Sequence, residues 1–326
     1  MKRSHAGFLA TGALGLIAAI AVPVTIAMAR GTTPASTMAT TKQVAPAAPL
    51  LTPAANVGIM VESCGYSHTT NADPILMPGM AGMSMLHDFF GNTATSAAST
   101  PSSLIGGTTT CNTPHDSSAY WMPALYVNGQ KITPLHSLIY WVAPRTSNVV
   151  TPPAGLELIA GNEHATSPQP LSVVAWNCQI GGLPVGRRAT QPVPCPTGME
   201  KVTITFPNCW DGRTLAGAAQ NNATYAIGAT CPAGFPVMIP QIVFHALYRL
   251  PAGIVTLSSG PGTVASVNTE HADFMSGWNQ DALTSIVNSC INSHLHCNPS
   301  GTITPRANPG GGPAARPTPS MSALTT

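Results

Sequence analysis

Two short segments, far apart in the sequence, combine a histidine with an aspartate. His87-Asp88 lies within NADPILMPGMAGMSMLHDFFGN (71–92), and His271-x-Asp273 lies within HADFMSGWNQDAL. Side chains alternate along an extended segment, so His271 and Asp273 should project to the same face. Such groups can orient each other or face a metal ion or a sugar. We therefore predict catalytic roles for His87, Asp88, His271 and Asp273, and a metal-ligand role for His87 and His271.

A structural role for the same residues is the alternative. Buried polar side chains usually form hydrogen-bonded networks that serve the fold. Asp273 could also cap the helix predicted after it.

Carboxylates are scarce, which limits the acid–base chemistry open to the chain. The sequence has 11 acidic residues, and hydrolysis by two carboxylates must draw both from this set. Asp273 is the preferred member, with Asp73, Asp88 or Asp211 as its partner. Alternatively, Asp73 and Asp211 cap turns through hydrogen bonds to their own backbone.

Methionines are concentrated just before His87. Met77, Met80, Met83 and Met85 follow the pattern M-x-x-M-x-x-M-x-M. Thioethers together with an imidazole favour Cu(I) over harder ions. The alternative is that these adaptable side chains fill irregular gaps under a loop. Proline and glycine interrupt both the helical and the strand period here, so we expect a long ordered loop over 71–92.

The cysteines predict a disulfide framework. Eight cysteines and no C-x-x-C pair argue for four disulfides and against a thiolate zinc site. Sequence alone allows 105 pairings for eight cysteines. Nearest-neighbour closure gives Cys64–Cys111, Cys178–Cys195, Cys209–Cys231 and Cys290–Cys297.

The organisation of the chain is typical of an exported protein. Residues 1–29 have a basic start, an apolar run and an Ala-Met-Ala ending, which predict a cleaved signal peptide; an uncleaved anchor is the alternative. Residues 30–55 have the composition of a Pro/Ala/Thr linker, and 299–326 that of a disordered Pro/Gly tail. The folded body is expected over 56–298, and no later stretch is apolar enough to span a membrane.

The charge composition limits the classes of partner that the chain is expected to bind. Charged residues make up 7% of the chain, and without Lys2 and Arg3 of the leader the 13 basic residues fall to match the 11 acidic ones. This neutrality argues against nucleic acids and anionic membranes as partners. Hydroxyl and amide side chains instead suit a neutral glycan, and we expect a monomer.

Strand signals dominate the body. Segments 119–132, 136–144, 155–161, 172–178, 201–210 and 236–250 are rich in branched and aromatic residues. Asn128-Gly129 predicts a tight hairpin turn. One helix is expected within 273–291, starting near 277–280 and ending before Asn292. We predict a mainly β fold, a single β-sandwich or jelly-roll-like domain with long ordered loops, few helices and one C-terminal helix.

Six blocks occur in a fixed order: DPILMPG…SMLHDFFGN, SAYWMPALYVNG, GLELIAGN, FPNCWDG, CPAGFPVMIPQI and HADFMSGWNQDAL. As a set they resemble the DUF1996 family of secreted bacterial and fungal domains of unknown function, over roughly Asn71 to Cys290. The resemblance implies an exported, disulfide-containing protein, in fungi sometimes joined to a wall-associated carbohydrate-binding domain, and implies no activity. The positions that match the family motifs are His87, Asp88, Trp210, Asp211, His271, Asp273 and Trp278.

One position departs from the family. The family loop usually reads Ser-His-x-His, whereas this chain has Ser84-Met85-Leu86-His87. If the paired histidines of relatives bind a metal, this site is impaired or retuned toward a softer ion.

Three functional hypotheses follow for a protein that we expect to be secreted, with the cell wall as one expected location. The first is binding to, or hydrolysis of, a neutral glycan, with Asp73, Trp210, Asp211 and Trp278 as ligand-binding residues. The second is a metal-dependent protein that uses His87 and His271, with Asp273 as a ligand or as a partner of a ligand. The third is a structural or adhesive surface protein without catalysis.

Overall fold

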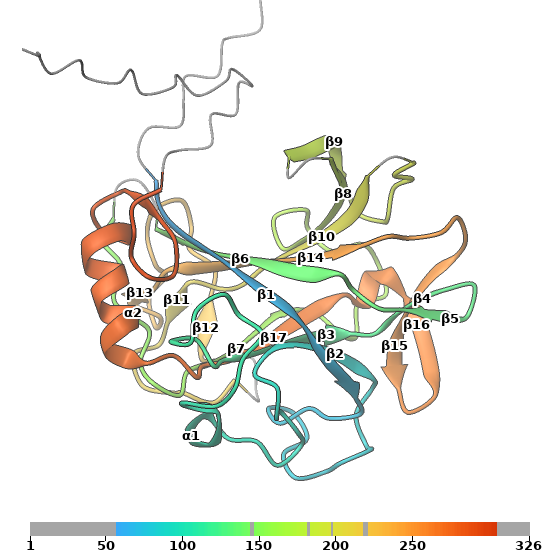
Figure 1. Cartoon of the computed structure of the whole chain (residues 1–326), viewed down its shortest axis with the longest axis horizontal. Coiled ribbons are helices and arrows are strands. Elements are labelled where there is room, and N and C mark those ends of the chain that lie inside the picture. The colour runs from blue at the N-terminus through green and yellow to red at the C-terminus, as the bar shows by residue number, and fades with distance from the viewer. Residues whose placement is uncertain (1–56, 144–146, 181–182, 197, 218–220, 305–326) are drawn as a thin grey trace, which may run out of the picture. The chain divides into compact units, whose positions relative to one another are not determined.

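One curled antiparallel sheet organises the chain (Figure 1). The computed structural model describes residues 57–143, 147–180, 183–196, 198–217 and 221–304. The predicted signal peptide and linker lie outside these residues, as does most of the predicted tail. In order across the main sheet, the strands are β7 (Glu157–Gly161), β17 (His271–Met275), β3 (Ala119–Pro123), β2 (His87–Gly91), β1 (Gly58–Thr70), β6 (His136–Ala143), β14 (Gln241–Tyr248), β10 (Met199–Thr205), β8 (Val174–Ile180) and β9 (Leu183–Ala189).

Strand β1 joins the two halves of this sheet. Its first part, Gly58–Gly65, pairs with β6, and its last part, Tyr66–Thr70, pairs with β2. The ladder with β2 contains a bulge between Tyr66 and His68, and a bulge bends a strand and increases its twist. The short strand β18 (His296–Cys297) runs parallel to the start of β1.

Aromatic side chains fill the concave face of the curled sheet. Tyr120 of β3 stacks on Phe244 of β14 at 6.2 Å between ring centroids, and Phe274 of β17 meets Trp141 of β6 at 5.8 Å. The two halves therefore face each other across one apolar core. The predicted mainly β fold is confirmed, and its two facing layers come from one sheet curled into a half-barrel.

Two small sheets complete the β structure. One contains β16 (Thr263–Ser266), β15 (Val255–Gly260), β4 (Leu125–Val127) and β5 (Gln130–Ile132), and the other contains β12 (Ala223–Thr224), β11 (Cys209–Trp210) and β13 (Val237–Met238). Between β4 and β5, Asn128 and Gly129 have φ of 49° and 79°. Positive φ at both central residues is the signature of the predicted hairpin turn.

Helices are few, as predicted, and those of the described residues are short. Besides α1 (Pro101–Leu104) and the 3-10 turn η1 (Val267–Thr269), α2 (Gln280–Ile286) continues into a π-helical turn, η2 (Val287–Ile291). The Asn279 side chain caps α2 by accepting from the Ala282 N–H. The alternative that Asp273 caps this helix is therefore wrong, because Asp273 lies in β17. No helix among the described residues is long and apolar enough to cross a membrane.

The segment 71–92 differs from its prediction at its end. Residues 71–86 form the expected loop, but His87–Gly91 is the buried strand β2. The prolines and glycines that break the period lie before His87, so the strand signal of His-Asp-Phe-Phe was masked by its neighbours. At the other end of the chain, residues 298–304 form a hydrogen-bonded turn after β18.

The four disulfides join the pairs given by nearest-neighbour closure. Each bond links segments that are already neighbours in the structure. They are Cys64–Cys111, Cys178–Cys195, Cys209–Cys231 and Cys290–Cys297. Loops of this size contribute about 2–4 kcal/mol each to stability, and disulfides persist in oxidising compartments.

A buried acidic network ties β1 to both halves of the sheet. The Glu62 carboxyl accepts hydrogen bonds from Trp141 Nε1 at 2.9 Å and from the Tyr120 hydroxyl at 3.3 Å. The Tyr120 hydroxyl also contacts the Asp116 carboxyl at 3.0 Å. Burial, followed by the charge of Asp116, raises the pKa of Glu62 well above its usual 4.5. Burial therefore favours the protonated, neutral form of the Glu62 carboxyl in the folded protein.

The raised pKa of Glu62 predicts an unusual pH dependence of stability. The unfolded carboxyl loses its proton near pH 4.5, whereas the raised pKa of the folded carboxyl means that it loses its proton at higher pH. The contribution is thus complete below pH 4.5 and is lost as pH rises toward the folded pKa. Glu62→Gln should flatten this loss of stability between pH 4.5 and 7.5. Urea unfolding across this pH range measures it, and a profile identical to wild type would contradict the assignment.

At Gly91, the last residue of β2, both the backbone conformation and the lack of space disfavour a side chain. Its φ is +80°, and a Cβ atom built there would lie 2.3 Å from the Ser118 carbonyl oxygen. Gly79 has a similar φ of +74° but open space around it.

These two glycines form a matched pair for mutation. Gly79→Ala should cost about 1 kcal/mol, because the left-handed conformation alone is unfavourable. Gly91→Ala should cost at least twice as much, since the backbone of Ser118 must also move. The free energies of unfolding in urea give both values. Equal costs would mean that the close approach to Ser118 does not constrain the fold.

Candidate functional site

The register of three strands brings His87 and His271 together. Strand β3 lies between β2 and β17, and His87 is directly opposite Pro123. Asp273 is opposite Trp121, so continuing that ladder by two residues places His271 level with Pro123 on its other side. The two imidazole rings meet edge to face with centroids 5.9 Å apart.

Each histidine has one nitrogen fixed by a backbone carbonyl. His87 Nδ1 donates to the Ala72 carbonyl at 2.9 Å, and His271 Nδ1 donates to the Thr269 carbonyl at 2.9 Å. A carbonyl can only accept, so Nδ1 carries the hydrogen in both rings. The two Nε2 atoms then present lone pairs, and neither has a hydrogen-bond partner among the described residues.

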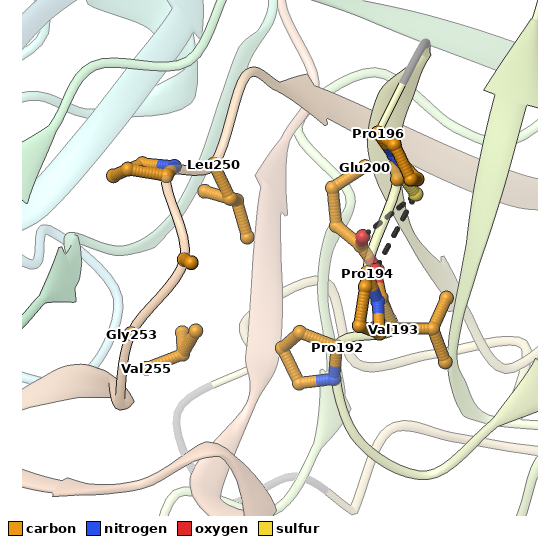
Figure 2. Close-up of a pocket in the computed structure, with 11 residues that line it drawn as sticks. Pro192, Val193, Pro194, Pro196, Glu200, Leu250, Gly253 and Val255 are labelled. Carbon is orange, nitrogen blue, oxygen red and sulfur yellow. Dashed lines mark hydrogen bonds between the residues drawn. The ribbon is translucent and has the colours of Figure 1, made fainter.

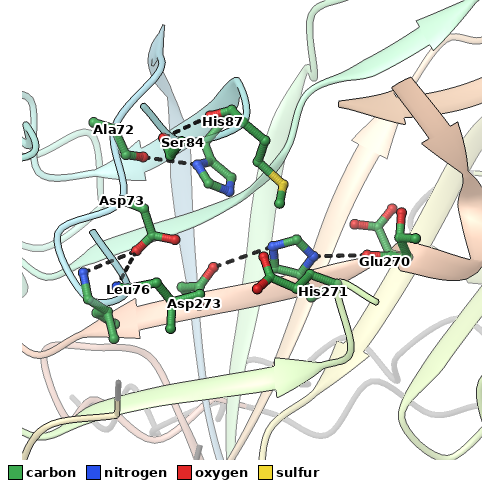
Figure 3. Close-up of polar contacts among 12 residues, drawn as sticks. Ala72, Asp73, Leu76, Ser84, His87, Glu270, His271 and Asp273 are labelled. Atoms are coloured by element: carbon green, nitrogen blue, oxygen red, sulfur yellow. Dashed lines mark hydrogen bonds and ion pairs between the residues drawn. The ribbon is translucent and has the colours of Figure 1, made fainter. Parts of the chain in front are cut away.

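Asp273 completes the cluster, as the alternation along β17 predicts. Its Oδ2 lies 3.9 Å from His271 Nε2, which is too far for a hydrogen bond. Neither carboxyl oxygen has a hydrogen-bond partner in the part of the chain that the structure describes. One ligand atom each from His87, His271 and Asp273 lie within 4.8 Å of one another. Figure 3 shows the side chains converging from β2 and β17.

The loop 71–86 covers this cluster and adds a second carboxyl. Asp73 Oδ1 accepts from the N–H groups of Ile75 at 3.1 Å and Leu76 at 2.9 Å, so Asp73 does cap a turn, as the alternative held. Its charge nevertheless reaches the cluster, because it acts on the pKa of both His271 and Asp273. Figure 3 shows Asp73 beside Asp273.

Burial sets the protonation of the cluster. It lowers the pKa of His87 to about 4, partly opposed by the hydrogen bond to Ala72. It also lowers the pKa of His271 to about 4, helped by the neighbouring His87. Burial, then the charges of Asp73 and Glu163, raises the pKa of Asp273 well above its usual range. Both imidazoles are therefore neutral at pH 7, the form that binds a metal.

Sequence reasoning did not single out Glu163. It follows β7, whose Gly161 pairs with His271, so β7 carries the acid toward the cluster. Its position just beyond the GLELIAGN block was the available signal. The pairing of β7 with β17 joins residues more than 100 positions apart, and no local pattern indicates it.

Apolar side chains enclose the cluster on the outer face of the sheet. Phe89 stacks near Trp121 at 5.5 Å between ring centroids, and the rings of Phe89 and His87 lie edge to face with their centroids 6.3 Å apart. Ile75 from the loop, with Met275 from β17, belongs to the same buried cluster. These groups keep water from the unpaired polar atoms.

Asp88 is not part of the cluster. Alternation along β2 turns it to the opposite face from His87, where it pairs with Lys131 at 2.8 Å and accepts from the Thr69 hydroxyl at 2.5 Å. The strand geometry therefore separates Asp88 from His87 and from the cluster.

The predicted glycan-binding residues are also dispersed. Trp278 is 1% exposed and packs against Trp141, so it has no free face for a sugar ring. Trp210 is half-buried in β11, with its Nε1 donating to the Thr214 carbonyl. Asp211 accepts from the N–H groups of Arg213 and Thr214, which is the turn-capping role given as its alternative.

A second candidate is the pocket of Figure 2, about 390 Å³ in volume. Four prolines and Leu250 make its lining mainly apolar, and none of the predicted catalytic, ligand-binding or metal-ligand residues lines it. Glu200 is its only carboxylate, and it accepts from the Val193 N–H at 3.0 Å. Burial raises the pKa of Glu200 to about 7. One carboxyl engaged by the backbone offers less chemistry than the histidine cluster.

Comparisons with known proteins identify the family. The model of a family described as "Domain of unknown function (DUF1996)" matches residues 73–278, which include the whole loop–β2 segment from Asp73 and both residues of β17 that face the cluster. No curated protein and no solved structure matches the chain.

Proposed function

This chain belongs to the DUF1996 family, whose description names no activity, and we propose that it is an exported metal-binding protein. His87, His271 and Asp273 are the proposed ligands. Four disulfides suit the oxidising compartment of an exported protein.

One observation carries this proposal. Four buried polar atoms, the two Nε2 atoms and both oxygens of Asp273, have no hydrogen-bond partner among the described residues, and one ligand atom from each of the three residues lies within 4.8 Å of the others. A network that served the fold alone would satisfy them, since an unpaired buried polar group costs about 1–3 kcal/mol. A cation between the three residues would accept a lone pair from each of them.

The ligand set indicates the class of metal. Two imidazoles and one carboxylate are typical of zinc, iron and other first-row transition metals, while Ca²⁺ and Mg²⁺ prefer all-oxygen sites. The Nδ1–H···O=C bonds to Ala72 and Thr269 fix the rings, as in many histidine metal ligands. Asp73 stands close enough to contribute a further charge.

The proposal concerns binding and assigns no reaction. His87 and Asp273 are fully buried and His271 is 1% exposed, so the loop 71–86 separates the cluster from solvent. A metal held there joins the loop-covered strand β2 to β17. Binding to the folded state alone adds about 2.7 kcal/mol of stability when the free metal is at 100 times its Kd.

Removing one ligand tests the proposal. Tag-free protein should bind one Co²⁺ or Zn²⁺, and His271→Ala should weaken binding by at least about 100-fold, since even the partners of ligands matter 10–100-fold. Asp273→Asn, which keeps the shape of the side chain, should act in the same direction. Cobalt absorption spectra and zinc competition titrations measure both.

His136→Ala is the matched control, because His136 lies in β6, outside the cluster. Its affinity should equal that of wild type, and circular dichroism should show that all variants fold. Tag-free wild-type protein that binds neither ion, or a His271→Ala variant that binds as well as wild type, contradicts the proposal.

Met85 offers a gain-of-function test. The Ala124 N–H donates to the Leu86 carbonyl, which extends the β2–β3 ladder beyond His87. An extended chain places the side chains of Met85 and His87 on the same side. Met85→His should therefore add an imidazole and tighten zinc binding by at least about tenfold.

Met83→His is the control, because Met83 is 56% exposed and points an added imidazole into solvent. It should leave zinc affinity at the buried cluster unchanged. Isothermal titration calorimetry with zinc measures the affinity of both variants. Equal affinities for both would show that Met85 does not face the metal.

The glycan hypothesis remains a prediction with less support. Trp210 is the one predicted aromatic ligand with an exposed part, and its indole N–H is already bonded. Wall association rests on the family resemblance and on the scarcity of charge. A glycan array probed with wild type and with Trp210→Ala would test it, and equal signals would remove Trp210 from consideration.

A further inference from the structure

Three methionines of the loop 71–86 are exposed to solvent. Met77, Met80 and Met83 are 36%, 50% and 56% exposed. The expectation that they fill gaps beneath the loop is therefore wrong for these three. An exposed thioether contributes little packing, so their shared exposure on one loop requires another explanation.

Two consecutive turns bring these methionines together. The Met80 N–H donates to the Met77 carbonyl at 3.1 Å, and the Met83 N–H donates to the Met80 carbonyl at 3.3 Å. Each bond closes a four-residue turn, which holds the Cα atoms of its first and last residues within about 7 Å. Methionine has three rotatable bonds, so the three sulfur atoms can reach a common point above the loop.

The loop itself is held in place. Gly79 donates its N–H to the Ala97 carbonyl at 2.6 Å, and Gly82 donates to the Asn71 carbonyl at 2.8 Å. Both glycines have positive φ, at +74° and +80°, with open space where a side chain would be. Hydrogen bonds to the rest of the fold thus hold the backbone that carries the methionines, and the two glycines add no side chain that would block access to them.

The chemistry of this surface selects a soft, monovalent ion. Residues 74–86 contain no charged side chain, so a hard cation finds no anionic ligand there. All eight cysteines are in disulfides, which leaves thioethers as the soft ligands available. Thioether ligands select Cu(I) among biological metals.

We propose that Met77, Met80 and Met83 form a surface site for Cu(I). The three thioethers are its ligands, and the ion binds as Cu(I), so no electron transfer is involved. This site is separate from the buried His87–His271–Asp273 cluster, and its existence does not depend on the function proposed for that cluster.

Competition for Cu(I) tests the proposal on the full-length, tag-free protein. Cu(I) is kept reduced with ascorbate and titrated against a chromogenic Cu(I) chelator. The triple variant Met77→Leu/Met80→Leu/Met83→Leu should lose at least about 100-fold in affinity at this site, since loss of even one outer partner of a metal ligand costs 10–100-fold. The double variant Met199→Leu/Met238→Leu removes two thioethers elsewhere and should bind as wild type.

The two metal sites can be told apart with the same variants. The triple methionine variant should keep the Co²⁺ binding of the buried cluster, while His271→Ala should keep the surface Cu(I) site. If the wild-type protein binds no Co²⁺, the proposal for the buried cluster is wrong and the Cu(I) proposal is unaffected. If the triple variant binds Cu(I) as tightly as wild type, the Cu(I) proposal is wrong, and this conclusion is independent of the Co²⁺ result.

Methyl resonances give a readout that does not need a variant. Protein labelled with ¹³C at the methionine methyl groups should show three resonances that shift on addition of Ag(I), a redox-inert stand-in for Cu(I). Single Leu substitutions assign them to Met77, Met80 and Met83. Shifts confined to other methionines, or no shifts with the folded protein, would contradict the site.

Discussion

Strand β1 has to pair with two different partners along its length, and the rest of the structure depends on how it does so. Its first eight residues complete the half that contains β6 and β14, and its last residues complete the half that contains β2 and β3. Because the strand bends at a bulge, the sheet curls and buries one face of each half against the other. Glu62, in the middle of β1, then receives hydrogen bonds from both halves, through Tyr120 and Trp141. The curl also leaves an outer face on β2, β3 and β17, and the loop 71–86 covers it.

The few acidic residues of this chain lie mainly in its interior. Most of the carboxyl groups in this chain are buried, in contrast to the usual exposure of such groups. The buried acids are Glu62, Asp73, Asp88, Asp116, Glu157, Glu200, Glu270 and Asp273, which is eight of the 11. A buried carboxyl must find donors, lose its charge or meet a cation. Asp88 forms an ion pair with Lys131, and burial raises the pKa of Glu62, which favours its neutral form. Asp273, by contrast, has neither a donor nor a basic residue within hydrogen-bonding distance among the described residues.

Local features were predictable from the sequence, and long-range register was not. The Asn128-Gly129 hairpin, the C-terminal helix and the shared face of His271 and Asp273 depend on neighbouring residues, so periodicity and turn chemistry were sufficient. The meeting of His87 with His271 depends on both lying level with Pro123, which only the pairing of three distant strands determines. Asp88 was misplaced because the end of the loop was not recognised as a strand, where alternation would have separated it from His87. Trp278 was misjudged because an aromatic residue in a motif block does not reveal whether its ring faces the core or the solvent.

Burial separates the two kinds of ligand atom that the loop 71–86 brings to the sheet. On its inner side, imidazole nitrogens and a carboxylate lie in an apolar enclosure, where unpaired polar atoms are costly and a cation is favourable. On its outer side, neutral thioethers face water at little cost, because sulfur is only weakly polar. Nitrogen and oxygen ligands suit borderline metals, and thioethers suit soft ones. The loop therefore lies between ligand atoms of different metal preference, and Met85 is two residues away from both Met83 and His87.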